Sequence, residues 1–223
     1  VPNNMASCIS GDIDPDKTFE IIEEHFSSWK RSESLRPEPK WDEKSLQGRE
    51  FVQVKYLGEE QLLMAFQTAP RFHQDYPALR LIDMILDNSV AGLINLNLVD
   101  RQAVRAAGCF PQSYNDYGAH YLYGIPKDGQ SMEEVENLLL NQVELVKKGE
   151  FADWILPAVL NDFKKSQKEN LESNPKRVEL LRDSFLSFVD SEVMDQEIQD
   201  LEKVTKEDVV RVANKYFGED YVV

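Results

Sequence analysis

Three histidines are the side chains from which a hydrolytic metal site could be built. Zinc peptidases hold their metal with two imidazoles on one helical face and a carboxylate nearby. His25, His73 and His120 are widely separated, and none has another histidine four residues away. The segment that ends at His25 would match the inverted zinc motif H-x-x-E-H if Ile21 were a histidine. The sequence therefore predicts no metal ligand and no catalytic residue in this chain.

Each histidine has an ordinary structural interpretation. His25 follows two glutamates on an amphipathic stretch, so we expect an interfacial helix residue. His73 follows a proline-containing segment and is predicted to lie in a loop. His120 lies within residues 119–123, which alternate like a strand, and we expect its side chain to point outward.

Nucleophilic and phosphate-binding motifs are missing from the sequence. Cys8 and Cys109 lie in apolar, strand-like stretches without a neighbouring histidine, so small core thiols are expected. A spatial pairing of either thiol with a histidine stays open. Two cysteines are too few for a disulfide framework and do not decide the redox compartment. The sequence contains neither a G-x-S-x-G elbow nor a glycine loop followed by Lys-Ser/Thr.

The charge balance argues against a nucleic-acid partner. The chain of 223 residues has 25 basic and 40 acidic side chains, a formal net charge of −15. Such a surface repels a phosphate backbone, and no basic cluster is longer than Lys147-Lys148 or Lys164-Lys165. No apolar stretch approaches the roughly 18 residues that would span a membrane. We expect a soluble protein in the cytoplasm or the periplasm.

The elements that position these side chains follow from hydrophobic periodicity and breaker residues. Predicted strands cover residues 5–13, 51–57, 61–68, 104–113, 119–125 and 221–223, and the second and third are expected to form a hairpin. Predicted helices cover residues 14–29, 76–86, 90–100, 131–148, 153–171, 176–189, 197–204 and 205–216. This order predicts a single α+β domain, 1–223, with a mixed, mainly antiparallel sheet packed against helices. Residues 1–130 are its sheet-containing part and residues 131–223 its mainly helical part.

Helix boundaries are marked by capping residues. Asp14 followed by Pro15 predicts the start of the first helix. Thr205 with Asp208 three residues on predicts a capping box, and Gly149 is predicted to end the helix 131–148. On the first helix, Phe19 recurs at helical spacing with later apolar residues and predicts an apolar face.

Several segments resemble the pitrilysin/insulinase family of zinc peptidases. Val1–Ala6 with Gly11–Pro15 is similar to the family's entry into the second half of a repeat. Glu60–Phe66 resembles the strand before its Pro-rich turn, and Tyr76–Leu93 resembles a helix pair. Leu201–Phe217 is similar to the closing helix of a repeat. In order and spacing, the resemblance covers essentially the whole chain.

The resemblance implies the fold of half a repeat and a non-catalytic role. In that family a repeat has two similar α+β domains, and the zinc motif with its glutamate ligand belongs to the first. This sequence resembles the second, so zinc is expected in the catalytic domain of the parent polypeptide and no cofactor is expected here. The expected partners are that catalytic domain and the parent's peptide substrates.

The family's C-terminal half also holds substrate with an Arg and a Tyr. Arg101 and Arg105 lie in the equivalent segment, but no Tyr follows at the expected place, so the role is not transferred. The substrate-binding residues stay unassigned. A first residue other than Met and an apolar end at Val223 further suggest a piece cut from a longer polypeptide.

The function implied is that of a structural or substrate-chamber domain in a zinc-dependent metallopeptidase that hydrolyses peptide bonds. This chain by itself is expected to be inactive. Two alternatives stay open: a domain of a catalytically inactive scaffold protein with the same fold, and an unrelated protein-binding module.

Overall fold

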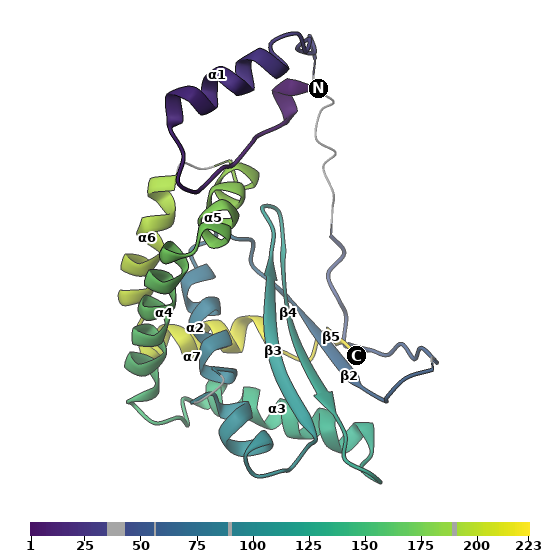
Figure 1. Cartoon of the computed structure of the whole chain (residues 1–223). Helices are drawn as coiled ribbons and strands as arrows, with labels where there is room; N and C mark the ends of the chain where they lie inside the picture. The colour runs from purple at the N-terminus through teal and green to yellow at the C-terminus, as the bar shows by residue number, and fades with distance from the viewer. Residues whose placement is uncertain (35–42, 56, 89–90, 189–190) are drawn as a thin grey trace. The chain divides into compact units, whose positions relative to one another are not determined.

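The computed structural model describes residues 1–34, 43–55, 57–88, 91–188 and 191–223 (Figure 1). The helices are α1 Pro15–Phe26, α2 Tyr76–Leu86, α3 Met132–Lys148, α4 Ile155–Glu172, α5 Asn174–Leu186, α6 Ser191–Glu202 and α7 Lys206–Tyr216. The strands are β1 Arg49–Glu50, β2 Leu62–Thr68, β3 Ala106–Ser113, β4 Gly118–Ile125 and β5 Tyr221–Val222. A 3-10 turn at Pro2–Asn4 and a π-helical segment at Asn95–Val99 complete the described elements.

Contacts group the chain into two compact units. The first consists of Val1–Asp42 and Lys164–Gln196, and we call it the helical unit. The second consists of Glu43–Phe163 and Glu197–Val223, and we call it the sheet unit because it contains all the described strands. The predicted single domain, with its division at residue 130, stays a prediction.

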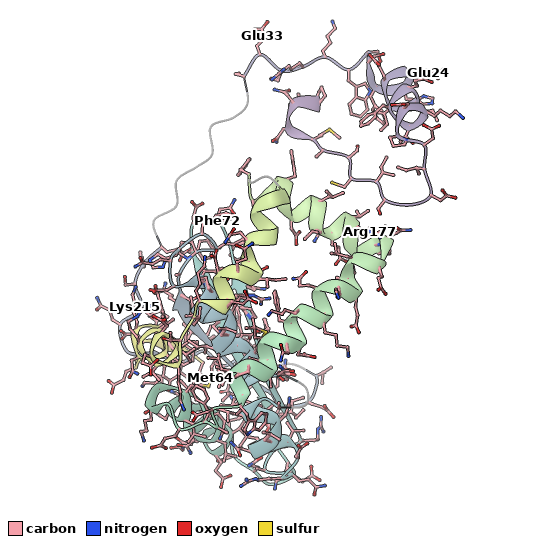
Figure 2. The ribbon with its side chains drawn as sticks, turned by 90° about the vertical axis from the view of Figure 1, so that its left-hand side faces the viewer. Glu24, Glu33, Met64, Phe72, Arg177 and Lys215 are labelled. Atoms are coloured by element: carbon pink, nitrogen blue, oxygen red, sulfur yellow. The ribbon has the colours of Figure 1, made fainter. Side chains whose placement is uncertain are left out.

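The helical unit leaves the apolar side chains of α1 exposed. Phe19 is 69% exposed, Ile21 and Phe26 are exposed as well, and no residue of α1, which the structure describes in full, is buried. Figure 2 draws the side chains of α1 as sticks, with Glu24 labelled on this helix. The predicted amphipathic helix forms, and its apolar side chains stay exposed among the described residues.

One mixed sheet organises the sheet unit. The described strands lie in the order β1-β5-β2-β4-β3, with β1 and β5 parallel and the other pairs antiparallel. The long β3–β4 hairpin forms one side of the sheet (Figure 1). The predicted α+β class with a mainly antiparallel sheet is confirmed.

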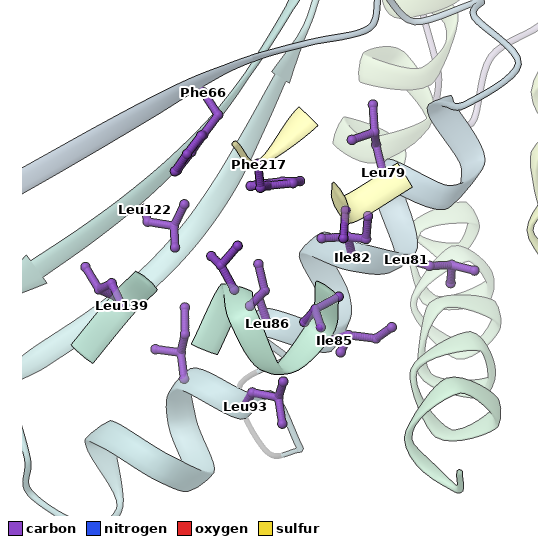
Figure 3. Close-up of a cluster of buried hydrophobic side chains, with 14 of the residues drawn as sticks. Phe66, Leu79, Leu81, Ile82, Ile85, Leu86, Leu93, Leu122, Leu139 and Phe217 are labelled. Atoms are coloured by element: carbon purple, nitrogen blue, oxygen red, sulfur yellow. The ribbon is translucent and has the colours of Figure 1, made fainter. Parts of the chain in front are cut away.

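The core lies between one face of this sheet and the helices α2, α3 and α7. Met64 and Phe66 of β2 alternate with exposed residues, and Leu122 of β4 pairs with Met64. Figure 3 shows Phe66 and Leu122 pointing toward Leu139 of α3 and Phe217 after α7. Full burial of each such side chain contributes about 1.5–3 kcal/mol, so this face holds the unit together.

Helix boundaries agree with the capping signals. Asp14 accepts hydrogen bonds from the backbone N–H groups of residues 16 and 17, and Pro15 occupies the first helical position. Thr205 and Asp208 form the predicted capping box before α7. Gly149 ends α3 with a φ of 68°, a left-handed conformation that glycine adopts without a steric penalty.

Two predicted strands and one predicted hairpin are wrong, and one predicted helix is shorter than expected. Residues 5–13 form no strand, because no described segment offers them a ladder partner. In the predicted strand 51–57, residues 51–55 and 57 are irregular, and residue 56 lies outside the described residues. The expected hairpin fails because β2 pairs with β4 along one edge and with β5 at Ala65 and Phe66 on the other. The helix predicted over 90–100 is reduced to a short segment around Asn95–Val99, and residue 90 is not described.

Candidate functional site on the sheet

The sheet presents an aromatic surface on the side opposite its core. Alternation along the strands places Leu63 of β2, Phe110 of β3, and Tyr121 and Tyr123 of β4 on this side. Leu63 pairs with Tyr123, and Phe110 pairs with Tyr121. Leu63 is 48% exposed and Phe110 is 40% exposed. We call these four residues the aromatic face.

The rings of the aromatic face are ordered by contact with one another. The Phe110 and Tyr121 rings stack with centroids 5.0 Å apart and an interplanar angle of 12°. The Phe110 and Tyr123 centroids are 6.5 Å apart. Such rigid, partly polar rings bury large areas at a low cost in side-chain entropy, which suits them to hold apolar or aromatic groups of a peptide.

The edge of the sheet at β3 is protected against pairing with another strand. The backbone N–H of Cys109 points away from β4 and donates to Oδ2 of Asp87 at 3.1 Å. Pro111, two residues on, faces the same edge and has no N–H to donate. Asn95 holds the other carboxylate oxygen of Asp87 at 3.0 Å. A peptide would therefore meet the face of this sheet more readily than this edge.

A polar cluster of Asp83, Cys109 and His120 lies on the core side of the sheet. Sγ of Cys109 lies 3.4 Å from Oδ1 of Asp83, and Nε2 of His120 lies 3.5 Å from the same oxygen. His120 is 1% exposed, and its Nε2 has no hydrogen-bond partner among the described residues. The three side chains come from α2, β3 and β4.

Burial shifts the pKa of every group in this cluster toward its neutral form. It raises the pKa of the Asp83 carboxyl to about 6. Burial together with the charge of Arg80 lowers the pKa of His120 to about 3. Burial and the carboxylates of Asp83 and Asp87 raise the pKa of the Cys109 thiol. A protonated thiol beside a neutral imidazole is a poor nucleophile, so this cluster does not resemble an activated cysteine.

Two further buried carboxylates connect helices to their neighbours. Asp75, before α2, accepts hydrogen bonds from Arg211, Lys215 and Tyr216 of α7 at 2.9, 2.7 and 3.0 Å. Burial acts to raise the pKa of Asp75, but these three donors outweigh it and hold the pKa at about 2. This carboxylate therefore stays ionised and fastens α7 to α2.

Glu136 makes the matching connection between α3 and the strands. Arg49 of β1 donates two hydrogen bonds to its carboxylate at 2.6 and 2.7 Å, and the Tyr221 hydroxyl of β5 donates a third at 2.8 Å. The Arg49 hydrogen bonds lower the pKa of Glu136 despite its burial. Because both carboxylate oxygens of Glu136 accept hydrogen bonds, this bidentate pair serves to hold α3 against the strands.

The structure separates most of the residues that the sequence put forward. Cys8 and His25 belong to the helical unit, whereas His73 lies in the loop before α2 and its Nδ1 accepts from the Asp75 backbone N–H. Arg101 is exposed, and Arg105 forms an ion pair with Glu59. His25 lies exposed on α1 as a helix residue, and His73 occupies the predicted loop.

The prediction for His120 is wrong. Its side chain points into the core because it shares the buried phase of β4 with Leu122. Cys109 pairs with Leu122, so Cys109 and His120 are diagonal neighbours on that face. The alternation in the sequence groups His120 with Leu122 on one face, but it does not say which face is buried. The sequence contained no signal that Asp83 of α2 would meet the pair, because that contact depends on how α2 packs on the sheet.

A family comparison identifies the domain to which this fold belongs. The model of the peptidase M16 inactive domain matches residues 1–162. The chain belongs to this family. The predicted relationship to pitrilysin/insulinase-type peptidases is thereby confirmed, and the M16 inactive domain is a non-catalytic domain of zinc peptidases.

Several relatives of this M16 inactive domain are about twice as long as this chain. The zinc protease PqqE of Helicobacter pylori is 27% identical over 225 residues, which cover 97% of this chain and 49% of that protein. A protease structure from the same organism superposes with a TM-score of 0.86 at 23% identity, covering 95% of this chain and 52% of the other. An M16 inactive domain from Pseudomonas fluorescens gives a TM-score of 0.71 at 14% identity, covering 95% and 51%. The chain thus spans about half the length of these relatives.

The described part of the M16 inactive domain was compared with the length and hydropathy that a membrane-spanning helix needs. None of the helices there is long and apolar enough to cross a bilayer. The periplasmic protease PqqL of Escherichia coli has a related fold, with a TM-score of 0.68 at 15% identity over 95% of this chain and 24% of that protein.

Proposed function

We propose that this chain is the non-catalytic half of a zinc-dependent M16 peptidase and that its aromatic face forms part of the wall that holds the peptide substrate. The observation that carries the proposal is the ordered, half-exposed ring cluster around Phe110 and Tyr121 on a sheet whose β3 edge is protected. Two findings support a longer parent peptidase. The chain belongs to the M16 family, and it covers about half of a zinc-protease relative.

The division of labour follows from which groups this chain has. Zinc, held by residues of the catalytic domain outside this chain, would supply the activated water that attacks the peptide carbonyl. The aromatic face would contribute binding by covering apolar side chains of the peptide and excluding water from them. Its rings carry no acid or base suited to the chemical step, so their effect is expected on substrate affinity.

The catalytic domain of the same polypeptide is the proposed partner of the helical unit. Phe19, Ile21 and Phe26 on α1, with Met5 and Ile9 before it, are all exposed in this chain. An apolar surface of this kind is costly in water and marks a contact with another protein surface. Of the two compartments expected from the sequence, the periplasmic relative from Escherichia coli supports the periplasm.

The test uses the full-length protein with its catalytic half and an unfolded fluorogenic peptide. Replacing Phe110 and Tyr121 by serine should raise KM about 5- to 30-fold, the loss of roughly 1–2 kcal/mol of aromatic contact, with kcat changed less than about twofold. Phe72→Ser is the matched control, because Phe72 is an exposed aromatic residue of the sheet unit outside the aromatic face. Cleavage should stop when a zinc chelator is added.

Two outcomes contradict parts of the proposal separately. An unchanged KM in the Phe110 and Tyr121 double variant would remove the substrate role of the aromatic face. A full-length protein without H-x-x-E-H in its other half, and without chelator-sensitive cleavage, would favour the catalytically inactive scaffold instead.

A further inference from the structure

We propose that Asp83, Cys109 and His120 together bind a divalent transition-metal ion, with zinc as the preferred metal. The site lies inside the sheet unit, between α2 and the β3–β4 hairpin, and is separate from the catalytic zinc expected in the other half of the protein. It does not depend on the proposed function, because a structural ion here would serve an active peptidase and an inactive scaffold equally.

The topology brings the three ligand types to one point. Cys109 and His120 are diagonal neighbours on the core side of adjacent strands, and α2 crosses that side with Asp83 directed at both. One ligand atom from each residue lies within 4.8 Å of the others. Residues from three separate elements converge here, which neither sequence spacing nor a single helix face could arrange.

The two distances from Asp83 match those between neighbouring ligands of one tetrahedral ion. Zinc bonds of about 2.0–2.3 Å at a tetrahedral angle put neighbouring ligand atoms about 3.4–3.6 Å apart. Oδ1 of Asp83 lies 3.4 Å from Sγ of Cys109 and 3.5 Å from Nε2 of His120. A sulfur, an imidazole nitrogen and a carboxylate oxygen form a ligand set that zinc and cobalt accept and that calcium or magnesium does not.

The unpaired nitrogen of His120 is suited to bind a metal ion. A fully buried polar nitrogen without a hydrogen bond costs about 1–3 kcal/mol, so folded proteins rarely leave one. Nε2 of His120 has no hydrogen-bond partner in the described part of the chain, and it faces Asp83. A metal bound to this atom would use its lone pair and remove the penalty.

The charges in the site balance on binding. A dication held by the Cys109 thiolate, the Asp83 carboxylate and the neutral His120 imidazole has no net charge, which lowers the cost of burying it. The thiol proton leaves to solvent as the sulfur–metal bond forms. Arg80 on α2 is a cation near the cluster, and Glu197 of α6 lies 3.5 Å from its Nε. Asp87 at the end of α2 adds a further negative charge.

The fourth position of the ion falls to water. The side chain of Asp83 is 15% exposed, so solvent reaches one side of the cluster. On this arrangement the ion would fasten α2 to the β3–β4 hairpin and thereby support the sheet that carries the aromatic face.

The experiment titrates the purified 223-residue chain with Co²⁺ and follows its absorption spectrum. One equivalent of cobalt should produce a thiolate-to-cobalt charge-transfer band and the strong visible bands of tetrahedral cobalt, and zinc should displace both. Cys8→Ala should keep these bands, whereas Cys109→Ala and His120→Gln should lose them and weaken zinc binding by about 100-fold or more. Cys8→Ala is the matched control because it removes the chain's other thiol by the same substitution.

A second measurement follows the reactivity of the Cys109 thiol itself. In Cys8→Ala, Cys109 is the remaining thiol, and saturating zinc should slow its alkylation by at least about tenfold. Adding Asp83→Asn should abolish that protection. The proposal is overturned if wild-type protein gives no thiolate–cobalt band, if Cys109→Ala binds zinc as tightly as wild type, or if zinc fails to protect Cys109. The expectation from the sequence that this chain has no metal ligand would then stand.

Discussion

Buried acidic residues in the sheet unit differ in what surrounds them, and this sets their charge. Asp75 receives hydrogen bonds from two cations and a hydroxyl, so its carboxylate stays ionised inside the protein. Asp83 is buried beside a thiol and an imidazole, and its pKa rises to about 6. Asp75 fastens two helices together. Asp83, by contrast, is a buried carboxyl with a raised pKa, as is common at ligand-binding positions.

At the residue scale we predict that Asp75→Asn makes stability less dependent on pH. Because the folded-state pKa of Asp75 is about 2, below the unfolded value, its contribution is present above the unfolded pKa and is lost as pH falls through the folded one. The variant should lose about 2 kcal/mol of unfolding free energy near pH 7, and this difference should shrink as pH falls from about 5 toward 3. Urea unfolding of both proteins across this range measures it. A difference that stays constant with pH would contradict the assignment.

The packing of α3 on β4 depends on a glycine at the contact between a helix and a sheet. Gly124 of β4 faces Val135 of α3, and a Cβ at this position would overlap Cγ1 of Val135 and lie 3.3 Å from Cδ1 of Leu139. Valine is stiff at χ1 in a helix and cannot turn aside easily. The helix therefore approaches the strand as closely as it does because residue 124 has no side chain.

At the element scale we predict that Gly124→Ala destabilises the protein by about 1–3 kcal/mol, since overpacking forces the helix or the strand to shift. Gly218→Ala is the control, because no heavy atom lies within 4 Å of a Cβ built there. Chemical denaturation gives both values. Equal effects of the two substitutions would show that α3 adjusts without cost.

At the scale of the whole molecule, the described residues form one extensive core in the sheet unit, whereas the apolar side chains Phe19, Ile21 and Phe26 of α1 in the helical unit are exposed. Phe66 is 1% exposed and contacts the Phe217 and Tyr221 rings at centroid distances of 5.2 and 5.1 Å. Phe19 on α1 has no comparable surroundings. The two phenylalanines thus sit in the same chain with opposite environments, as expected if α1 packs on another domain of a longer protein.

At the scale of the whole molecule we predict opposite outcomes for these two positions. Phe66→Ala should reduce the unfolding free energy of the isolated chain by about 3–5 kcal/mol. Phe19→Ala should change it by less than about 0.5 kcal/mol. Denaturant unfolding followed by circular dichroism checks both. A large loss from Phe19→Ala in the isolated chain would show that α1 already belongs to a core here, and the proposed docking to a catalytic domain would lose its support.

Local signals in the sequence were sufficient for elements whose cause is local. Hydrophobic spacing gave the bounds of α2, and the Asp14, Gly149 and Thr205 signals gave helix ends, because capping and periodicity act within a few residues. The family and its non-catalytic role also followed from ordered motifs, without any tertiary information. The alternation at residues 51–55 misled the prediction, because a strand forms where a partner accepts its hydrogen bonds.

Only the tertiary structure decided which face each strand turns to the core and which distant residues meet. The side of β4 on which His120 lies follows from sheet register, since a shift by one residue exchanges the faces. The meeting of Asp83 with Cys109 and His120 follows from how α2 crosses the sheet. The aromatic face likewise exists because β2, β3 and β4 pair in one register. These contacts depend on long-range packing, which no pattern within a single segment encodes.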